Sequence, residues 1–347
     1  MSNIIENNIA VVTSRSLAKS GGIQTVTRTL FEGVLPIFFL GEDEDLEKKL
    51  ESYSTVVFSG FDETFVELNR TLRKHGKKIA MFWHFGAASE VDVDLGRAWR
   101  AVVQMNKEGN FDLFITCKYG LEFTASKLFK LPSFLILNNA MEDNYKNINK
   151  EGIGIYSGSS DYWVKNLRPN LYAALMTEMH VDIAPYDDTI RGVVKDLGMD
   201  TFVTGVNGRV NHDDFLKRMA SRELVSYVTF AEGAPIMPLE ALNNGVVCLT
   251  GDNHHYFRED QRLHDLLVVT RPDDPKAIYD AILRGIANKK EIIQRYSEWK
   301  KGYDKLQKEN FEQLLKSLTA LSNSERWGAI APLSFCTFTI LCLTYTN

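Results

Sequence analysis

The chain has 347 residues, of which 44% are hydrophobic and 24% are charged, and its formal net charge is −5 at pH 7. This composition excludes a disordered chain, and the acidic balance lacks the basic surface that nucleic-acid-binding proteins need, so we expect no nucleic-acid partner. The length exceeds the usual domain size of about 100–150 residues, which predicts two domains.

The first half of the chain alternates apolar strands with amphipathic helices. Strands are expected at residues 8–14, 54–60, 77–84, 111–117 and 133–139. These strands are continuous apolar segments instead of alternating apolar and polar residues. Helices are expected between them, where apolar residues recur with helical spacing, at residues 23–34, 62–76, 94–109 and 120–130. This order indicates a parallel sheet that is covered on both faces.

A polar segment at residues 140–152 interrupts the alternation and is the expected linker. The alternation then restarts. Apolar, strand-like runs are expected at residues 153–160, 180–186, 201–206, 223–230, 246–251 and 265–270. Helices are expected at residues 163–176, 189–198, 212–221, 238–245, 274–289 and 289–321. The predicted fold class is α/β with two doubly wound parallel sheets, in an N-terminal domain 1–145, a C-terminal domain 146–320 and an apolar tail 321–347.

The ends of the chain and its cysteines bear on location. Residues 1–16 lack the pattern of a secretory signal. The four cysteines form no CxxC pair, which favours buried free thiols in a reducing compartment. Residues 327–347 carry no charge over nearly a membrane span, although Pro332 and several threonines favour a buried or irregular tail. We expect a cytoplasmic protein and keep peripheral membrane association as the alternative.

The chemistry is expected in loops that follow strands, because doubly wound sheets bind ligands at the carboxyl ends of their strands. Gly21 and Gly22 precede a helix, where glycines let a phosphate approach the backbone, although a tight turn explains such a pair more often. His84 follows an apolar strand and could hydrogen-bond a sugar or phosphate or donate a proton. A structural role for this histidine is equally plausible from the sequence.

Charged residues follow two strands of the second domain. Lys165 and Arg168 lie three residues apart, a spacing that would put them on one face of a helical turn to hold a diphosphate, or leave them as solvated charges. Glu232 lies in a loop rich in Gly and Pro, and Glu240 lies just inside the next helix, which Pro238 can begin. Either glutamate alone could simply complement a helix dipole, but the pair at this spacing indicates a ligand site.

We predict no metal site. Asp92 and Asp94 form an Asp-x-Asp pattern, but they lead into a helix, where capping explains them. His254 and His255 have no third ligand nearby.

The quoted loops resemble a known family. The stretches SGGIQTVTRTL, WHFG, LILNNAMED and FAEGAPIMPLEALNNGVVCLTG are similar to those of the retaining glycosyltransferases of family 4, which have the GT-B fold. The family pattern has two glutamates with seven residues between them, as Glu232 and Glu240 have here. In element order the resemblance extends to about Leu318, and its most specific part is the segment with the two glutamates.

The resemblance implies a nucleotide-diphosphate sugar as donor, a glycan, lipid-linked or other hydroxyl acceptor, and no cofactor or metal. It implies catalytic roles for Glu232, His84 and Lys165. It implies donor-binding roles for Gly21, Gly22, Lys165, Arg168, Glu232, Gly233, Ala234, Pro235, Ile236, Met237 and Glu240.

The implied roles differ between these residues. The paired glycines would line the diphosphate, which Lys165, with Arg168 as the weaker candidate, would neutralise as it leaves. His84 would lie near the transferred sugar. Glu232 would hold hydroxyls of that sugar, and Glu240 would hold the ribose hydroxyls of the nucleotide.

The chain departs from the family pattern in two places. No arginine precedes Lys165 where the family usually has one, and Ala-Pro replaces an aromatic-Gly pair after Gly233. The missing arginine, together with the unusual apolar tail, keeps a binding protein open, whereas the Ala-Pro replacement could change the sugar that is accepted. The first expectation is a retaining, metal-independent transferase. The alternatives are a catalytically impaired nucleotide-sugar-binding protein that acts with a partner, and a nucleotide-sugar epimerase. A dehydrogenase is disfavoured because the dinucleotide fingerprint is missing.

Overall fold

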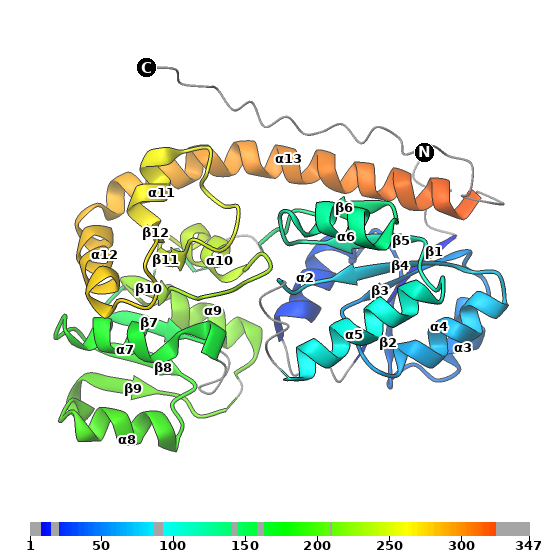
Figure 1. The fold of residues 1–347 in the computed structure, drawn as a ribbon. Helices are drawn as coiled ribbons and strands as arrows, with labels where there is room; N and C mark the ends of the chain where they lie inside the picture. The colour runs from blue at the N-terminus through cyan, green and yellow to red at the C-terminus, as the bar shows by residue number, and fades with distance from the viewer. Residues whose placement is uncertain are drawn as a thin grey trace.

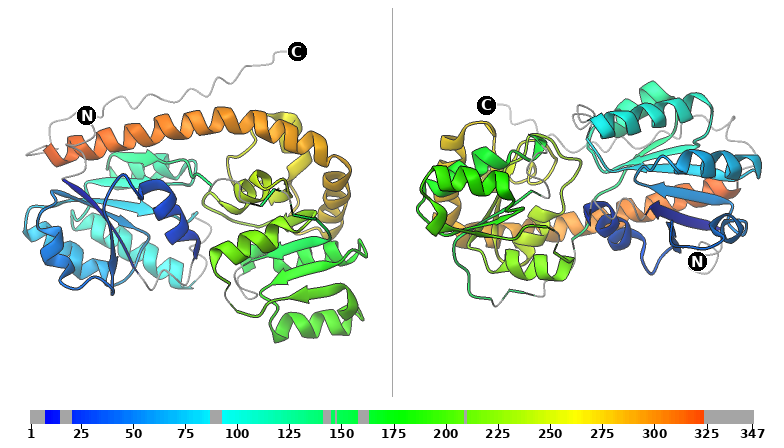
Figure 2. Two further views of the ribbon diagram at one scale, coloured as in Figure 1. Left: turned by 180° about the vertical axis from the view of Figure 1, so that it is seen from behind. Right: turned by 90° about the horizontal axis from the view of Figure 1, so that it is seen from below.

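The computed structural model describes residues 8–14, 21–86, 93–140, 145–146, 148–157, 163–208 and 210–323. Within these ranges the chain forms two six-stranded sheets, and every pair of neighbouring strands is parallel. The two sheets lie in separate halves of the molecule, and one long helix, α13, runs along both (Figures 1 and 2). The predicted pair of doubly wound parallel sheets is therefore confirmed.

The first sheet has the strand order β2-β1-β3-β4-β5-β6. Its strands are β1 (Ile9–Ser14), β2 (Ile37–Leu40), β3 (Thr55–Ser59), β4 (Lys78–Trp83), β5 (Leu113–Thr116) and β6 (Ser133–Leu135). The accompanying helices are α2 (Gly21–Phe31), α3 (Leu46–Leu50), α4 (Phe65–Lys74), α5 (Val93–Lys107) and α6 (Leu121–Phe129). Strands β1 and β3 are buried along their whole length, because helices cover both faces of the sheet.

The second sheet has the strand order β12-β11-β10-β7-β8-β9. Its strands are β7 (Ile153–Tyr156), β8 (Val181–Ala184), β9 (Val203–Gly205), β10 (Leu224–Tyr227), β11 (Val247–Gly251) and β12 (Val268–Val269). Its helices are α7 (Leu167–Leu175), α8 (Asp188–Asp196), α9 (His212–Ala220), α10 (Met237–Asn243), α11 (Gln261–Leu267) and α12 (Pro275–Ala287). Short 3₁₀ turns at Trp163–Lys165 and Asp200–Phe202 complete this half.

Some elements differ from the sequence-based expectation. The edge strand β2 and the short helix α3 are missing from the sequence-based expectation. Strand β2 is an apolar run of 4 residues, IFFL, which is too short for periodicity to identify it as a strand. The sequence predicts a strand at 265–270, but Asp265–Leu267 end α11, and the strand is limited to Val268–Val269. Asp260 caps α11 by accepting a hydrogen bond from Leu263 N at 2.9 Å, and short apolar runs fit a buried helix face as well as a strand.

Helix α13 (Lys289–Asn323) connects the two halves. It contacts α11 and α12 beside the second sheet, and also β1, β3 and β4 of the first. Asn310 Oδ1 accepts a hydrogen bond from Leu137 N at 3.0 Å, and Phe311 lies 5.7 Å from the Phe31 ring. One buried apolar cluster therefore extends from the first sheet along α13 into the second. The domain limits given above stay a prediction.

The structure describes only part of the residues on which the predictions about membrane association and cysteine state depend. No helix within the described ranges is long and apolar enough to cross a membrane. The uncharged segment 327–347 lies outside the described residues, as do Cys336 and Cys342, whereas Cys117 and Cys248 are buried free thiols, as predicted.

Candidate functional site

The three predicted catalytic residues lie at the carboxyl ends of strands of the two sheets, and the backbone of His84 contacts the Glu232 loop. His84 follows β4, Lys165 ends the 3₁₀ turn after β7, and Glu232 lies in the loop after β10. The loops of the two domains touch here. A Cβ atom built on Gly233 would lie 2.2 Å from the carbonyl oxygen of His84, and one on Gly86 would lie 2.9 Å from that of Glu232. Glycine at 233 is therefore required by a contact between the domains.

Lys165 and Glu232 form an ion pair that includes an unpredicted tyrosine. Lys165 Nζ lies 2.6 Å from Glu232 Oε1 and 2.9 Å from the Tyr227 hydroxyl, and that hydroxyl donates to Glu232 Oε1 at 2.6 Å. Burial alone would lower the pKa of Lys165, but Glu232 and Tyr227 outweigh burial and raise it above its ordinary value. Lys165 is therefore a fixed positive charge at neutral pH.

A network of buried amides holds the Lys165 turn against the Glu232 loop. Asn166 donates from Nδ2 to the Val228 carbonyl at 3.0 Å, and Asn170 donates to the same oxygen at 2.9 Å. Asn170 Oδ1 also accepts from Val228 N at 3.1 Å. The backbone of Phe230 donates to Val164 O at 2.8 Å. These bonds connect the start of α7 to the end of β10, so the ion pair is built on a rigid support.

Arg168 does not share a face with Lys165, so this part of the prediction is wrong. Asn166 has a left-handed backbone (φ 54°) between the 3₁₀ turn and α7, and this break cancels the helical spacing on which the prediction depended. Arg168 is exposed on α7, and its side chain has no hydrogen bond or ion pair within the described part of the chain. Its role at a diphosphate stays a prediction.

Glu240 is paired with a histidine that the sequence did not indicate. The carboxylate is buried in α10, and its Oε1 lies 2.8 Å from His212 Nε2, at the first residue of α9. This hydrogen bond raises the pKa of His212 above its ordinary value. A protonated histidine at the positive end of a helix is unfavourable unless a carboxylate faces it, and Glu240 supplies that carboxylate.

His84 is a buried, neutral group. Burial lowers its pKa to about 3, and its ring packs on Phe82 with the centroids 3.9 Å apart. Its Nε2 lies 2.9 Å from Ser59 Oγ, at the end of β3. The interpretation of His84 as a proton donor is therefore disfavoured, and its use as a hydrogen-bonding ring is supported.

The remaining predicted donor contacts lie in two backbone segments. Helix α2 begins at Gly21, and a Cβ atom on Gly22 would meet nothing within 4 Å, so no contact between described residues requires glycine there. In the Glu232 loop, Gly233, Ala234 and Pro235 are buried, and Ile236 and Met237 are half-buried at the start of α10. An unpredicted residue, Asn138, fixes this loop by donating to Ala234 O at 2.5 Å.

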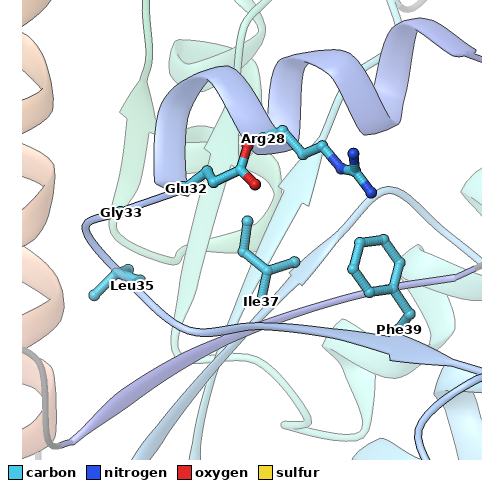
Figure 3. A pocket seen from close by; sticks show the side chains of 6 residues that line it. All are labelled: Arg28, Glu32, Gly33, Leu35, Ile37 and Phe39. Atoms are coloured by element: carbon cyan, nitrogen blue, oxygen red, sulfur yellow. The ribbon is translucent and has the colours of Figure 1, made fainter.

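Two further features lie apart from this constellation. A cavity of about 280 Å³ lies between the second half of α2 and the edge strand β2, where Arg28 and Glu32 face Ile37 and Phe39 (Figure 3). It shares no residue with the predicted site. No group of three metal-binding side chains occurs within the described ranges, and Asp92 lies outside them.

Among the comparisons with known proteins, only the comparison with solved structures gives matches. No protein-family model and no curated protein matches the chain. The pneumococcal O-GlcNAc transferase GtfA, solved with UDP and GlcNAc, matches 80% of this chain at 12% identity and a TM-score of 0.57. The chain spans only 59% of the length of that GtfA chain.

Two other solved structures match this chain over nearly their whole length. Alr3699/HepE of Anabaena, solved with UDP-glucose, matches 90% of this chain and 99% of its own, at 11% identity and a TM-score of 0.63. Sucrose-phosphate synthase of Thermosynechococcus elongatus matches 91% and 96%, at 14% identity and a TM-score of 0.59. Such identities show the fold alone. With its two facing parallel sheets, the chain has the GT-B fold.

Proposed function

We propose that this protein is a retaining, metal-independent glycosyltransferase that moves a sugar from a nucleotide-diphosphate sugar to a hydroxyl acceptor on a glycan or lipid-linked molecule. The observation that carries the proposal is the Lys165–Tyr227–Glu232 constellation, in a loop that contacts the His84 backbone where the two GT-B domains meet. Fixed charges at such a boundary can act on a ligand that both domains enclose.

Lys165 would stabilise the leaving diphosphate. Breaking the anomeric bond builds negative charge on the phosphate oxygens, and a permanently protonated ammonium neutralises it without a metal. An ammonium has three N–H donors, and Lys165 uses two of them for Glu232 and Tyr227. The third is left for a phosphate oxygen.

The two glutamates would hold opposite ends of the donor. Glu232 would accept hydrogen bonds from hydroxyls of the transferred sugar, and the buried Glu240, oriented by His212, would accept them from the ribose. His84 would bind as a neutral ring. The solved structures with UDP and with UDP-glucose support a nucleotide-sugar donor as the class to test first.

A second candidate is a nucleotide-sugar-binding protein that turns over poorly. It is favoured by the exposure of Arg168, which leaves Lys165 as the predicted cation at the ion pair. A nucleotide-sugar epimerase would instead convert the donor without an acceptor.

A thermal-shift screen against nucleoside diphosphates and their sugars tests the proposal, because a ligand that binds the native state raises the melting temperature. We expect one nucleotide sugar to raise it in the wild type and in Glu309→Gln, an exposed control, but not in Glu240→Gln. No shift with any compound, or an equal shift in Glu240→Gln, would contradict the donor assignment. Once a bound donor is identified, its products are analysed with and without acceptors. A transferase needs an acceptor, an epimerase converts the donor alone, and a binding protein forms no product.

A further inference from the structure

Four groups form a hydrogen-bonded chain behind His84. Thr27 Oγ1 lies 2.8 Å from the Ile23 carbonyl oxygen within α2, and 2.7 Å from Ser59 Oγ at the end of β3. Ser59 Oγ lies 2.9 Å from His84 Nε2. The Thr27 and Ser59 side chains are fully buried, and His84 is 9% exposed. The chain is therefore shielded from water except at the histidine.

The positions of the hydrogens in this chain follow from its far end. A carbonyl oxygen can only accept, so Thr27 donates its single hydroxyl hydrogen to Ile23. Thr27 then accepts from Ser59, and Ser59, with its hydrogen used, accepts from His84 Nε2–H. In the reverse direction the oxygens of Thr27 and Ile23 would face each other at 2.8 Å with no hydrogen between them.

This direction determines the tautomer of the histidine. A neutral imidazole carries one N–H, so a proton on Nε2 leaves Nδ1 as an acceptor. Nδ1 has no hydrogen-bond partner within the described part of the chain. The backbone carbonyl of the same residue lies at the contact between the domains, against Gly233.

We propose that Thr27 and Ser59 are positioning residues that hold His84 as the Nε2–H tautomer, so that Nδ1 accepts a hydrogen bond from a hydroxyl of the transferred sugar. The sugar contact rests on the proposed function; the tautomer does not. The consequence is a preference in the donor. A hydroxyl facing Nδ1 is accepted, whereas an oxygen without a hydrogen, as in a carboxylate, would place one lone pair against another.

Nitrogen-15 NMR of the free protein tests the tautomer directly, since hydrogen positions are otherwise only inferred from the network. The His84 signals are assigned by their loss in His84→Gln. We expect Nε2 to be protonated and Nδ1 unprotonated in the wild type. In Thr27→Val, Ser59 is free to donate to Nε2, so the proton should move to Nδ1 although no atom that touches His84 has changed.

Two variants provide matched controls. Thr27→Ser keeps the hydroxyl and should keep the wild-type tautomer. Thr29→Val removes a hydroxyl of the same helix that bonds Thr25 O at 2.8 Å but has no link to Ser59, so it should also leave the tautomer unchanged. A wild-type His84 protonated on Nδ1, or a Thr27→Val protein with an unchanged tautomer, would overturn the assignment.

Kinetics test the contact with the sugar. With a turned-over donor, Thr27→Val should lower kcat/KM by about tenfold, as expected for one lost hydrogen bond, while Thr27→Ser and Thr29→Val retain it. A shifted tautomer with unchanged kcat/KM would overturn the role of Nδ1. A wild type that turns over no donor would instead refute the proposed function, and the sugar contact with it, whatever the tautomer.

Discussion

The two domains contribute different chemistry to the site. The candidate site residue of the first domain, His84, is a neutral group, because burial lowers its pKa to about 3, and it is linked to the hydroxyl of Ser59. The first domain also places the amine of Lys118 at the contact, where it donates to Asn253 O. The second domain offers paired ionisable groups, Lys165 with Glu232 and His212 with Glu240. We propose a division of labour, in which the second domain would bind and neutralise the donor and His84 of the first domain would orient the sugar through a hydrogen bond.

The largest effect on donor turnover is expected for the Lys165–Glu232 ion pair of the second domain. Lys165→Met removes the fixed cation and leaves Glu232 with the Tyr227 hydroxyl but without its ion-pair partner, so kcat should fall by roughly a thousandfold. Steady-state donor turnover measures the effect. Lys276→Met, which breaks an exposed pair with Asp280 on α12, is the control and should keep the wild-type rate. Equal rates in both variants would contradict the proposed role of the second domain in neutralising the donor.

The contact between the domains should be the next most sensitive feature. A methyl group at Gly233 would lie 2.2 Å from a backbone oxygen of His84, so Gly233→Ala must push the two loops apart. We expect a loss of about 2 kcal/mol in the free energy of unfolding and a fall in kcat of at least about tenfold. Denaturant unfolding and turnover measure these effects.

Gly302→Ala is the matched substitution for this test. Nothing lies within 4 Å of a Cβ atom at this position in α13, so the change should be neutral or stabilising by up to about 1 kcal/mol. A Gly233→Ala protein that is as stable and as active as Gly302→Ala would show that the domains do not need this contact.

The two histidines should respond to pH in opposite directions. The folded pKa of His84 lies below the ordinary value of 6.5, so its contribution to stability is present above that value and is lost as the pH falls towards 3. The folded pKa of His212 is raised, so its contribution is present below 6.5 and is lost as the pH rises through the raised value.

Melting temperatures of the wild type, His84→Gln and His212→Gln between about pH 4 and pH 9 measure this contrast. The difference between wild type and variant should shrink at low pH for His84 and at high pH for His212. Differences that change in the same direction would show that the two sites do not differ in charge as described.

The smallest effect is expected at Arg168. Because it is exposed on α7 beyond the break at Asn166, Arg168→Ala should change kcat/KM by less than about twofold. A loss comparable with that of Lys165→Met would restore Arg168 to the diphosphate site and imply a rearrangement of this turn on donor binding.

The sequence predicted the fold and the charged residues better than their partners. Apolar periodicity indicated both parallel sheets, and the spacing of Glu232 and Glu240 indicated a ligand site. The partners Tyr227 and His212 were missed because their contacts join separate elements, and local pattern carries no record of such pairs. The spacing argument for Arg168 was wrong because a single left-handed residue, Asn166, interrupts the helix.

The hydrogen-bonded chain of Thr27, Ser59 and His84 was the least predictable part of the site. His84 was identified from its place at a strand end, but nothing in the sequence connects it to Ser59, 25 residues away, or to Thr27 on α2. Both hydroxyls look like ordinary buried residues at the end of a strand and in a helix. Their importance arises only when β3, β4 and α2 pack together.

In the proposed mechanism Glu232, paired with Lys165, holds the sugar of a nucleotide-diphosphate donor during transfer. The most direct test is the rate at which wild type and Glu232→Gln consume a bound donor, with the anomeric configuration of the product read by NMR. We expect a product that keeps the donor configuration, formed at least about a hundredfold more slowly by Glu232→Gln. An inverted product, or an undiminished rate in the variant, would contradict it.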